Sequence, residues 1–173
     1  RDRVVRLWSL PGGEPVRQLS GHENTVTSLF CLGDGTLASG SVDTTLRFWT
    51  PATGQPAGEI KPSKAYLHTS VAAPHGRVAA ILDGYGTLQV LEISSGKKIR
   101  TLKELYYSTD VGAVLSFSAD GRWLAYPSEK GFKVMNVATG QDRTFLLEGA
   151  YPQAIAFSPD GKSLAVGRRD SII

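Results

Sequence analysis

The chain has only one cysteine, Cys31, among its 173 residues, and it lacks any long run of apolar residues. A single cysteine excludes a disulfide within the chain and favours a reducing compartment, so we predict a cytoplasmic location. No stretch approaches the roughly 18–20 apolar residues that a membrane-spanning helix needs. We therefore expect no membrane partner.

An excess of one charge is also missing. Lysine and arginine total 19 and aspartate and glutamate total 16, which gives a net charge of +3. The basic residues are scattered among the acidic ones instead of forming a run, which is typical of an ordinary solvated surface. Because a nucleic-acid footprint needs a basic cluster, we expect no nucleic-acid partner.

Residues for metal binding or catalysis are few. The three histidines, His22, His68 and His75, lie in different parts of the chain, and no pair of cysteines stands at zinc-ligand spacing. Cys31 aligns with Phe117 in the repeat described below, so we expect a small buried apolar residue there and not a nucleophile. The sequence predicts no metal and no cofactor.

The glycine-rich stretches do not point to catalysis either. Residues 33–35 and 84–86 each join one strand pattern to another with no helix after them, which indicates hairpin turns and not phosphate-binding loops. No Gly-x-Ser-x-Gly sequence is present. We therefore predict no catalytic residue and no enzymatic activity within this chain.

One stretch sets the pattern for the whole chain. Residues 21–49 read as three short strands separated by two tight turns, with Gly21-His22 before the first strand and Trp49 near the end of the third. Looser copies of this pattern follow one another along the sequence. The residues that end the third strand of successive copies, separated by 41, 42 and 44 positions, are Trp8, Trp49, Leu91 and Met135.

This period and the Gly-His to Trp arrangement resemble the WD40-repeat β-propeller family, in particular the degenerate repeat arrays of multidomain prokaryotic proteins. The resemblance implies an all-β fold, a propeller segment of four-stranded antiparallel blades within a ring of seven or eight. The expected units are the last two strands of a blade over residues 1–20, three full blades over 21–60, 61–102 and 103–146, and the first half of a blade over 147–173.

The chain holds about four blade-equivalents and starts and stops at the same phase of the repeat. Arg1 stands inside a strand pattern, so we expect a segment cut from a longer propeller. The alternative is a homodimer in which two copies complete a ring of eight, because an open arc leaves unpaired strand edges.

The resemblance also implies a hydrogen-bonded network inside the best-matching blade. Its members by position are a histidine, a serine on the second strand, an aspartate of the following turn and a tryptophan: His22, Ser39 or Ser41, Asp43 and Trp49. Such a network is structural, because it satisfies buried polar groups. The next blade has Ser63 or Lys64 in place of the histidine and Leu91 in place of the tryptophan, so we expect the other blades to depend on apolar packing.

Five of the six tyrosines fall in or beside loops that, in the WD40 arrangement, lie on one face of the disc. Tyrosine offers a large contact area and a hydroxyl, and it is enriched at binding hot spots. The candidate partner-binding residues are these tyrosines and two arginines of the surrounding polar rim: Tyr66, Tyr85, Tyr106, Tyr107, Tyr151, Arg168 and Arg169. The alternative is that the rings only fill space at the blade junctions.

The function that follows is a non-catalytic interaction scaffold or sensor module that docks a protein or peptide on one propeller face. A second hypothesis is a propeller domain accessory to a hydrolase or signalling enzyme whose catalytic domain lies outside this chain. Hydrolases of the prolyl-peptidase type carry similar Phe-Ser-Pro-Asp-Gly turns, as found here at residues 157–161. The histidine, aspartate and tryptophan of the first full blade favour the WD40 hypothesis.

Overall fold

The computed structural model describes residues 2–103, 105, 114–129, 131–147 and 152–168. Within this part of the chain there are sixteen β-strands and no helix, and every strand pairing is antiparallel. Short runs of alternating apolar and polar residues, bounded by glycine-containing turns, produce these strands. The predicted all-β fold class is confirmed.

Three of the sheets have four strands each, in chain order. The first holds β3 (Val26–Cys31), β4 (Leu37–Ser41), β5 (Leu46–Thr50) and β6 (Gln55–Ile60). The second holds β7 (Leu67–Ala72), β8 (Val78–Asp83), β9 (Leu88–Glu92) and β10 (Lys98–Leu102). The third holds β11 (Ser116–Phe117), β12 (Trp123–Ser128), β13 (Gly131–Asn136) and β14 (Asp142–Leu146).

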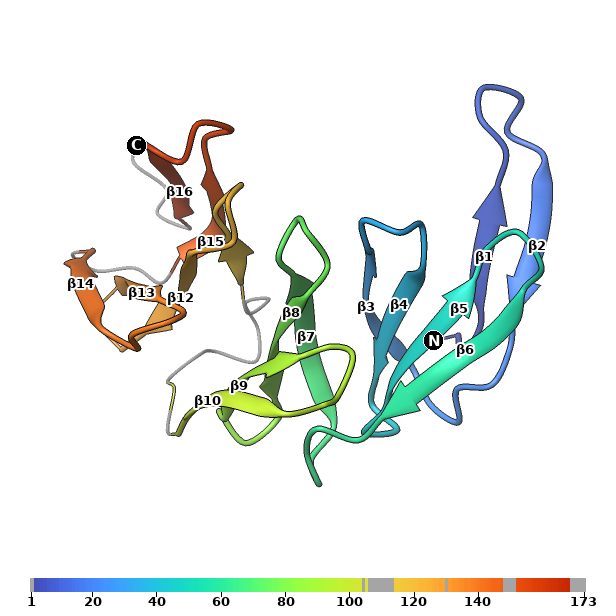
Figure 1. Ribbon diagram of the computed structural model, residues 1–173, viewed down its shortest axis with the longest axis horizontal. Helices are drawn as coiled ribbons and strands as arrows, with labels where there is room; N and C mark the ends of the chain where they lie inside the picture. The colour runs from blue at the N-terminus through green and yellow to red at the C-terminus, as the bar shows by residue number, and fades with distance from the viewer. Residues whose placement is uncertain (1, 104, 106–113, 130, 148–151, 169–173) are drawn as a thin grey trace.

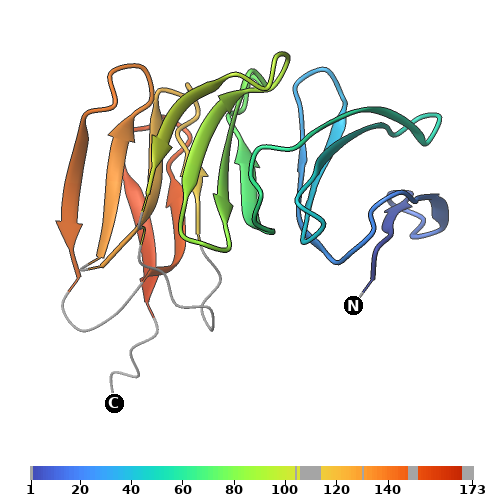
Figure 2. The same cartoon turned by 90° about the horizontal axis from the view of Figure 1, so that it is seen from below.

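Two smaller sheets lie at the ends of the described chain. One pairs β1 (Val5–Trp8) with β2 (Pro15–Leu19), and the other pairs β15 (Pro152–Phe157) with β16 (Leu164–Arg168). The five sheets follow one another around an arc (Figure 1), and the second and third four-stranded sheets are seen as adjacent layers in the perpendicular view (Figure 2). The first strands β3, β7, β11 and β15 lie next to one another at the inside of this arc. This is the arrangement of blades in a β-propeller.

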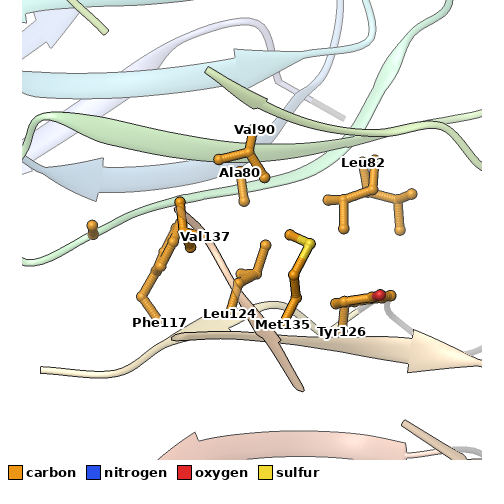
Figure 3. Packing of buried hydrophobic residues seen from close by; sticks show 10 residues of the cluster. Ala80, Leu82, Val90, Phe117, Leu124, Tyr126, Met135 and Val137 are labelled. Atoms are coloured by element: carbon orange, nitrogen blue, oxygen red, sulfur yellow. The ribbon is translucent and has the colours of Figure 1, made fainter. Parts of the chain in front are cut away.

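The hydrophobic core is divided among the junctions between neighbouring sheets. At the junction of the second and third sheets, side chains of β8 and β9 pack against side chains of β11, β12 and β13 (Figure 3). Leu82 and Val90 come from one side and Leu124 and Met135 from the other, all with no more than a trace of exposure. Each blade therefore buries its apolar faces only by stacking on its neighbours.

The exposure of Trp49 and Trp8, two tryptophans at equivalent positions of the repeat, depends on whether a neighbouring sheet packs against the ring. Trp49 is buried against Val5 and Leu19, whereas Trp8, at the same place in the β1–β2 sheet, is 56% exposed. The described residues contain no first or second strand for that sheet, so more than half of the surface of Trp8 stays exposed. The position of the tryptophan is fixed by the repeat, but its burial depends on the adjoining strands.

Cys31 is exposed, and the prediction of a buried residue there is wrong. Its counterpart Phe117 is buried because it packs against Ala73 and neighbouring residues of the second sheet. Cys31 and Leu29 instead point to the side of β3 that faces the β1–β2 sheet, which has no inner strand to cover them within the described chain. Cys31 and Phe117 are equivalent positions of the repeat, as the sequence alignment predicts. Only Phe117 has apolar residues of a preceding sheet packed against it within the described chain.

The hairpins between second and third strands share one geometry. In the β4–β5 hairpin the Thr44 amide donates to the Ser41 carbonyl at 3.2 Å, and in the β8–β9 hairpin the Gly86 amide donates to the Asp83 carbonyl at 3.1 Å. Thr44 and Gly86 both have positive φ, 74° and 76°. A turn followed by one left-handed residue is a common three-residue hairpin loop. These hairpins place the candidate site residues at the same end of neighbouring sheets.

Candidate functional site

A buried polar cluster joins the strands of the first four-stranded sheet. The His22 imidazole lies 2.7 Å from Asp43 Oδ2 through Nδ1 and 2.7 Å from Ser39 Oγ through Nε2. The Trp49 indole Nε1 donates to the same Ser39 Oγ at 2.8 Å. We name His22, Ser39, Asp43, Thr45 and Trp49 the His22 network.

The pattern of donors assigns the protons. The carboxylate of Asp43 can only accept, so His22 Nδ1 carries the hydrogen, and His22 Nε2 accepts from the Ser39 hydroxyl. The Ser39 oxygen in turn accepts the indole N–H of Trp49. Both imidazole nitrogens, the Ser39 hydroxyl and the Trp49 indole N–H therefore have hydrogen-bond partners. The site is buried, and an unpaired polar group there would cost about 1–3 kcal/mol. The network therefore holds the loop before β3, the strand β4 and the strand β5 together.

Asp43 accepts hydrogen bonds from other donors in addition to His22. The Thr45 hydroxyl and amide donate to Oδ1 at 2.6 and 2.9 Å, and the Glu23 amide donates to Oδ2 at 2.9 Å. Burial opposes ionisation of the carboxyl, but these hydrogen bonds and the one from His22 outweigh it and lower the pKa of Asp43 from 3.8 to about 2. Asp43 is thus an ionised anchor of the turn.

The lowered pKa of Asp43 predicts how stability depends on pH. Because the folded pKa lies below the unfolded value, the ionised carboxylate contributes its full stabilisation above about pH 4 and loses it as the pH falls toward about 2. We expect Asp43→Asn to lower the free energy of unfolding by about 2 kcal/mol near neutral pH. Urea denaturation of both proteins at a series of pH values measures this difference. A difference that stays constant from neutral pH down to about pH 2.5 would contradict the assignment.

Ser41 lies beside the His22 network but bonds neither His22 nor Trp49. Its hydroxyl donates to the Asn24 carbonyl at 3.2 Å and accepts the Asp43 amide at 3.1 Å. Of the two serines that sequence analysis proposed, Ser39 is the one that links the histidine to the tryptophan, because its hydroxyl lies within hydrogen-bond distance of both rings. Ser41 instead supports the turn. The repeat pattern in the sequence does not identify Thr45 as a member of the network.

The second four-stranded sheet replaces this network with a smaller one. Ser63 takes the place of the histidine and donates to Asp83 Oδ2 at 2.6 Å, while Asp83 Oδ1 accepts the amides of Tyr85 and Thr87, each at 3.0 Å. Asp83 occupies the register position of Ser41, two residues before that of Asp43. The second sheet thus has the apolar packing that its sequence predicts and, in addition, a polar link that the sequence analysis did not predict.

The third sheet has a polar link of another kind. The Tyr126 hydroxyl donates to Asp142 at 2.8 Å, and the Lys133 ammonium group donates to the same carboxylate at 3.1 Å. Burial of the ring and the neighbouring carboxylate both raise the pKa of Tyr126 well above its usual range. Tyr126 is thus a structural residue of β12, as its position in a strand predicts.

Two of the tyrosines proposed for partner binding fall within the described chain. Tyr85 stands at the tip of the β8–β9 hairpin with 81% of its surface exposed. Tyr66 precedes β7, is 36% exposed, and lies over Gly84 so closely that no Cβ fits there. Tyr85 therefore has the exposure of a docking residue, whereas Tyr66 combines exposure with packing at the hairpin.

The other proposed docking residues give no structural test. Tyr106, Tyr107, Tyr151 and Arg169 lie outside the described residues. The backbone of Arg168 ends β16 and pairs with Pro152, but its side chain is likewise outside the described part. The structure thus brings together Tyr66 and Tyr85 at one end of the second sheet and leaves the remainder of the set as predictions.

Neither a metal-binding cluster nor a membrane-spanning helix occurs in the described part of the chain. It holds no group of three or more histidine, cysteine, aspartate or glutamate side chains placed to share a metal ion. Nor does any helix in it have the length and apolar character to cross a membrane. The described polar clusters are explained by the hydrogen bonds within each sheet.

Comparison with known proteins gives a family match at the first four-stranded sheet. A family model described as "WD domain, G-beta repeat" matches residues 13–50, the segment that contains the His22 network. The chain is 31% identical over 134 residues to Protein tipD of Dictyostelium discoideum, which covers 75% of this chain and 22% of that protein.

Two other relatives align over more of the chain. Human apoptotic protease-activating factor 1 is 29% identical over 170 residues, 94% of this chain and 14% of that protein. The rice small ribosomal subunit protein RACK1y is 24% identical over 149 residues, 80% of this chain and 42% of that protein. The chain thus spans less than half the length of each of these three relatives.

The stacked four-stranded antiparallel sheets and the His22 network define a protein of the β-propeller class, built from blades that follow one another along the chain. The family match and the relatives make the assignment more specific. This chain belongs to the WD40-repeat family.

Proposed function

We propose that the chain is a non-catalytic scaffold segment that docks a protein or peptide at the end of the second sheet where Tyr66 and Tyr85 lie. The observation that carries the proposal is the 81% exposure of Tyr85 at a hairpin tip whose backbone is fixed by Asp83. An exposed aromatic ring on a rigid support loses little entropy when it is buried by a partner.

The family supports this proposal in a general way. WD40-repeat proteins mostly serve as interaction scaffolds, and the rice relative is named as a protein of the small ribosomal subunit, which is a large assembly. The human relative is named as a protease-activating factor, which fits the second hypothesis of a propeller accessory to a signalling protein.

Site-specific crosslinking tests the docking face. We expect a photoreactive amino acid at position 85 to capture a partner from a lysate of the cells that produce the chain. The same group at position 77 serves as the matched control, because Arg77 is also exposed but lies at the opposite end of β8. Mass spectrometry of the crosslinked products then identifies any protein that is captured at position 85 and absent at position 77.

The outcome separates docking from simple exposure. A defined product at position 85 that disappears when unlabelled chain is added in excess supports the proposal, because competition shows a saturable site. Equal capture at positions 85 and 77, or capture at position 77 alone, contradicts it. Thermal melts of both labelled proteins serve as the folding control, since neither position is part of the core.

A further inference from the structure

A hollow of about 740 Å³ lies between the first and second four-stranded sheets, next to Tyr85. Its walls come from the segment between β6 and β7, from the β8–β9 hairpin and from the outer strand β10. Ser63, Asp83 and Gln89 line it, and four lysines surround it: Lys61, Lys64, Lys98 and Lys103. We name this feature the lysine hollow.

The hollow exists because the second sheet has smaller side chains than the first. Leu91 stands at the register position of Trp49, and Ser63 takes the role of His22. Gln89 stands at the position of Arg47, which in the first sheet pairs with Glu59 at 3.1 Å. The first sheet thus fills this place with its own aromatic ring and ion pair, whereas the second leaves it open.

Gln89 is the unsatisfied polar group of the hollow. The residue is only 4% exposed, and its Oε1 atom is buried without a hydrogen-bond partner. A buried polar atom without a partner costs about 1–3 kcal/mol, so native structures rarely keep one without a reason. Because the unpartnered atom is an amide oxygen, it is able to accept a hydrogen bond from an N–H group of a ligand placed in the hollow.

The surrounding charges favour an acidic ligand. Within the described chain Lys64, Lys98 and Lys103 form no ion pair, and Lys61 reaches Glu59 only at 4.0 Å. Asp83, the acidic residue of the wall, is held by Ser63 and by the amides of its own hairpin. The hollow therefore presents positive charge on its edge and a hydrogen-bonding amide in its wall.

The spread of the lysines indicates an extended ligand. Lys98 begins β10 and Lys103 directly follows its last residue, so the two are five residues apart, a separation of about 16 Å at the usual rise of a strand. One phosphate group cannot reach both, whereas the carboxylates of an extended peptide repeat about every 7 Å along one side. Lysine is also a mobile point charge, which suits several separate carboxylates better than the two-pronged grip of arginine on one anion.

We propose that the lysine hollow binds an extended acidic peptide, whose carboxylates contact the lysines and one of whose backbone N–H groups donates to Gln89 Oε1. The proposal rests on the docking function proposed above and names the chemistry of the partner at that face. Tyr85 lies at the edge of the hollow, so its ring covers part of the bound peptide.

Fluorescence anisotropy with a synthetic probe tests this inference on the full chain. The probe is a labelled decapeptide of alternating glutamate and glycine, and the matched probe has glutamine in place of glutamate. We expect saturable binding of the glutamate probe that weakens as salt is added, and at least fivefold weaker binding of the glutamine probe.

Four variants locate the site. Lys64→Gln and Lys103→Gln should each weaken binding of the glutamate probe about three- to fivefold. Gln89→Leu should weaken it about three- to tenfold, because it removes the acceptor of a peptide N–H. Lys97→Gln removes the same charge from the same sheet outside the hollow and should leave binding unchanged. If Gln89→Leu does not fold, the lysine variants decide alone, because their side chains are exposed.

The inference is overturned if the glutamate probe fails to bind, if both probes bind equally, or if Lys97→Gln weakens binding as much as the hollow variants do. These outcomes are distinct from failure of the docking function. A chain that captures a partner through position 85 but does not bind the glutamate probe retains the docking function and loses the acidic-peptide inference. A chain that binds the probe but captures nothing at position 85 retains the site and loses the docking function.

Discussion

Leu124→Ala should lower the free energy of unfolding by about 3–4 kcal/mol. Leu124 has no exposed surface and packs from β12 into the junction between the second and third sheets (Figure 3). The substitution removes buried apolar surface and leaves a cavity that the surrounding strands cannot fill, because both sheets are held by their own hydrogen bonds. Urea denaturation monitored by tryptophan fluorescence measures the change.

Leu146→Ala is the matched control for this prediction. Leu146 is also a leucine on a strand of the third sheet, but 72% of its surface is exposed. We expect a change of about 0.5 kcal/mol or less there. Equal effects of the two substitutions would show that the junction between the sheets does not carry the core, contrary to the fold described here.

His22→Ala should lower the free energy of unfolding by about 3 kcal/mol. The substitution takes away the donor to Asp43 Oδ2 and the acceptor of the Ser39 hydroxyl in a site that is closed to water. Asp43 keeps the donors from Thr45 and Glu23, so the charge remains partly satisfied and the loss stays below that of a fully unpaired buried ion.

His75→Ala provides the comparison for the histidine. The His75 ring lies at the β7–β8 turn, is exposed, and makes one hydrogen bond to the Asp120 carbonyl at 3.1 Å. We expect it to change stability by about 0.5–1 kcal/mol. If His22→Ala costs no more than His75→Ala, the His22 network does not stabilise its blade, and the role assigned to it is wrong.

The fold class could be predicted from the sequence alone because two independent signals, a residue spacing and a set of turn residues, indicate the repeat. The spacing of Trp8, Trp49, Leu91 and Met135 sets the period, and turn residues mark the hairpins between the strands. Both signals are local, so they persist where the Gly-His and Trp residues have been lost. The number of blades in the complete ring has no such local signal and stays a prediction.

The sequence predicted the site less completely, because its geometry depends on neighbours. The positions of His22, Ser39, Asp43 and Trp49 follow from the repeat, but the choice between Ser39 and Ser41 needed the distances from each hydroxyl to the two rings. The exposure of Cys31 depended on strands of another sheet.

The lysine hollow was missed for a similar reason. It arises from the smaller residues Ser63 and Leu91 in the second sheet acting together with Gln89 and lysines of three separate segments. No single motif contains these residues. A comparison of side-chain volumes at equivalent positions of the two sheets would have been the only available signal.

We propose that stability and docking depend on different residues of the chain. Partner capture by His22→Ala and Tyr85→Ala, measured side by side at a temperature where thermal melts show both proteins folded, tests this separation. We expect His22→Ala to melt at a lower temperature and to retain capture, whereas Tyr85→Ala should melt like the unaltered chain and lose capture. Loss of capture in both variants together with equal losses of stability would contradict this separation.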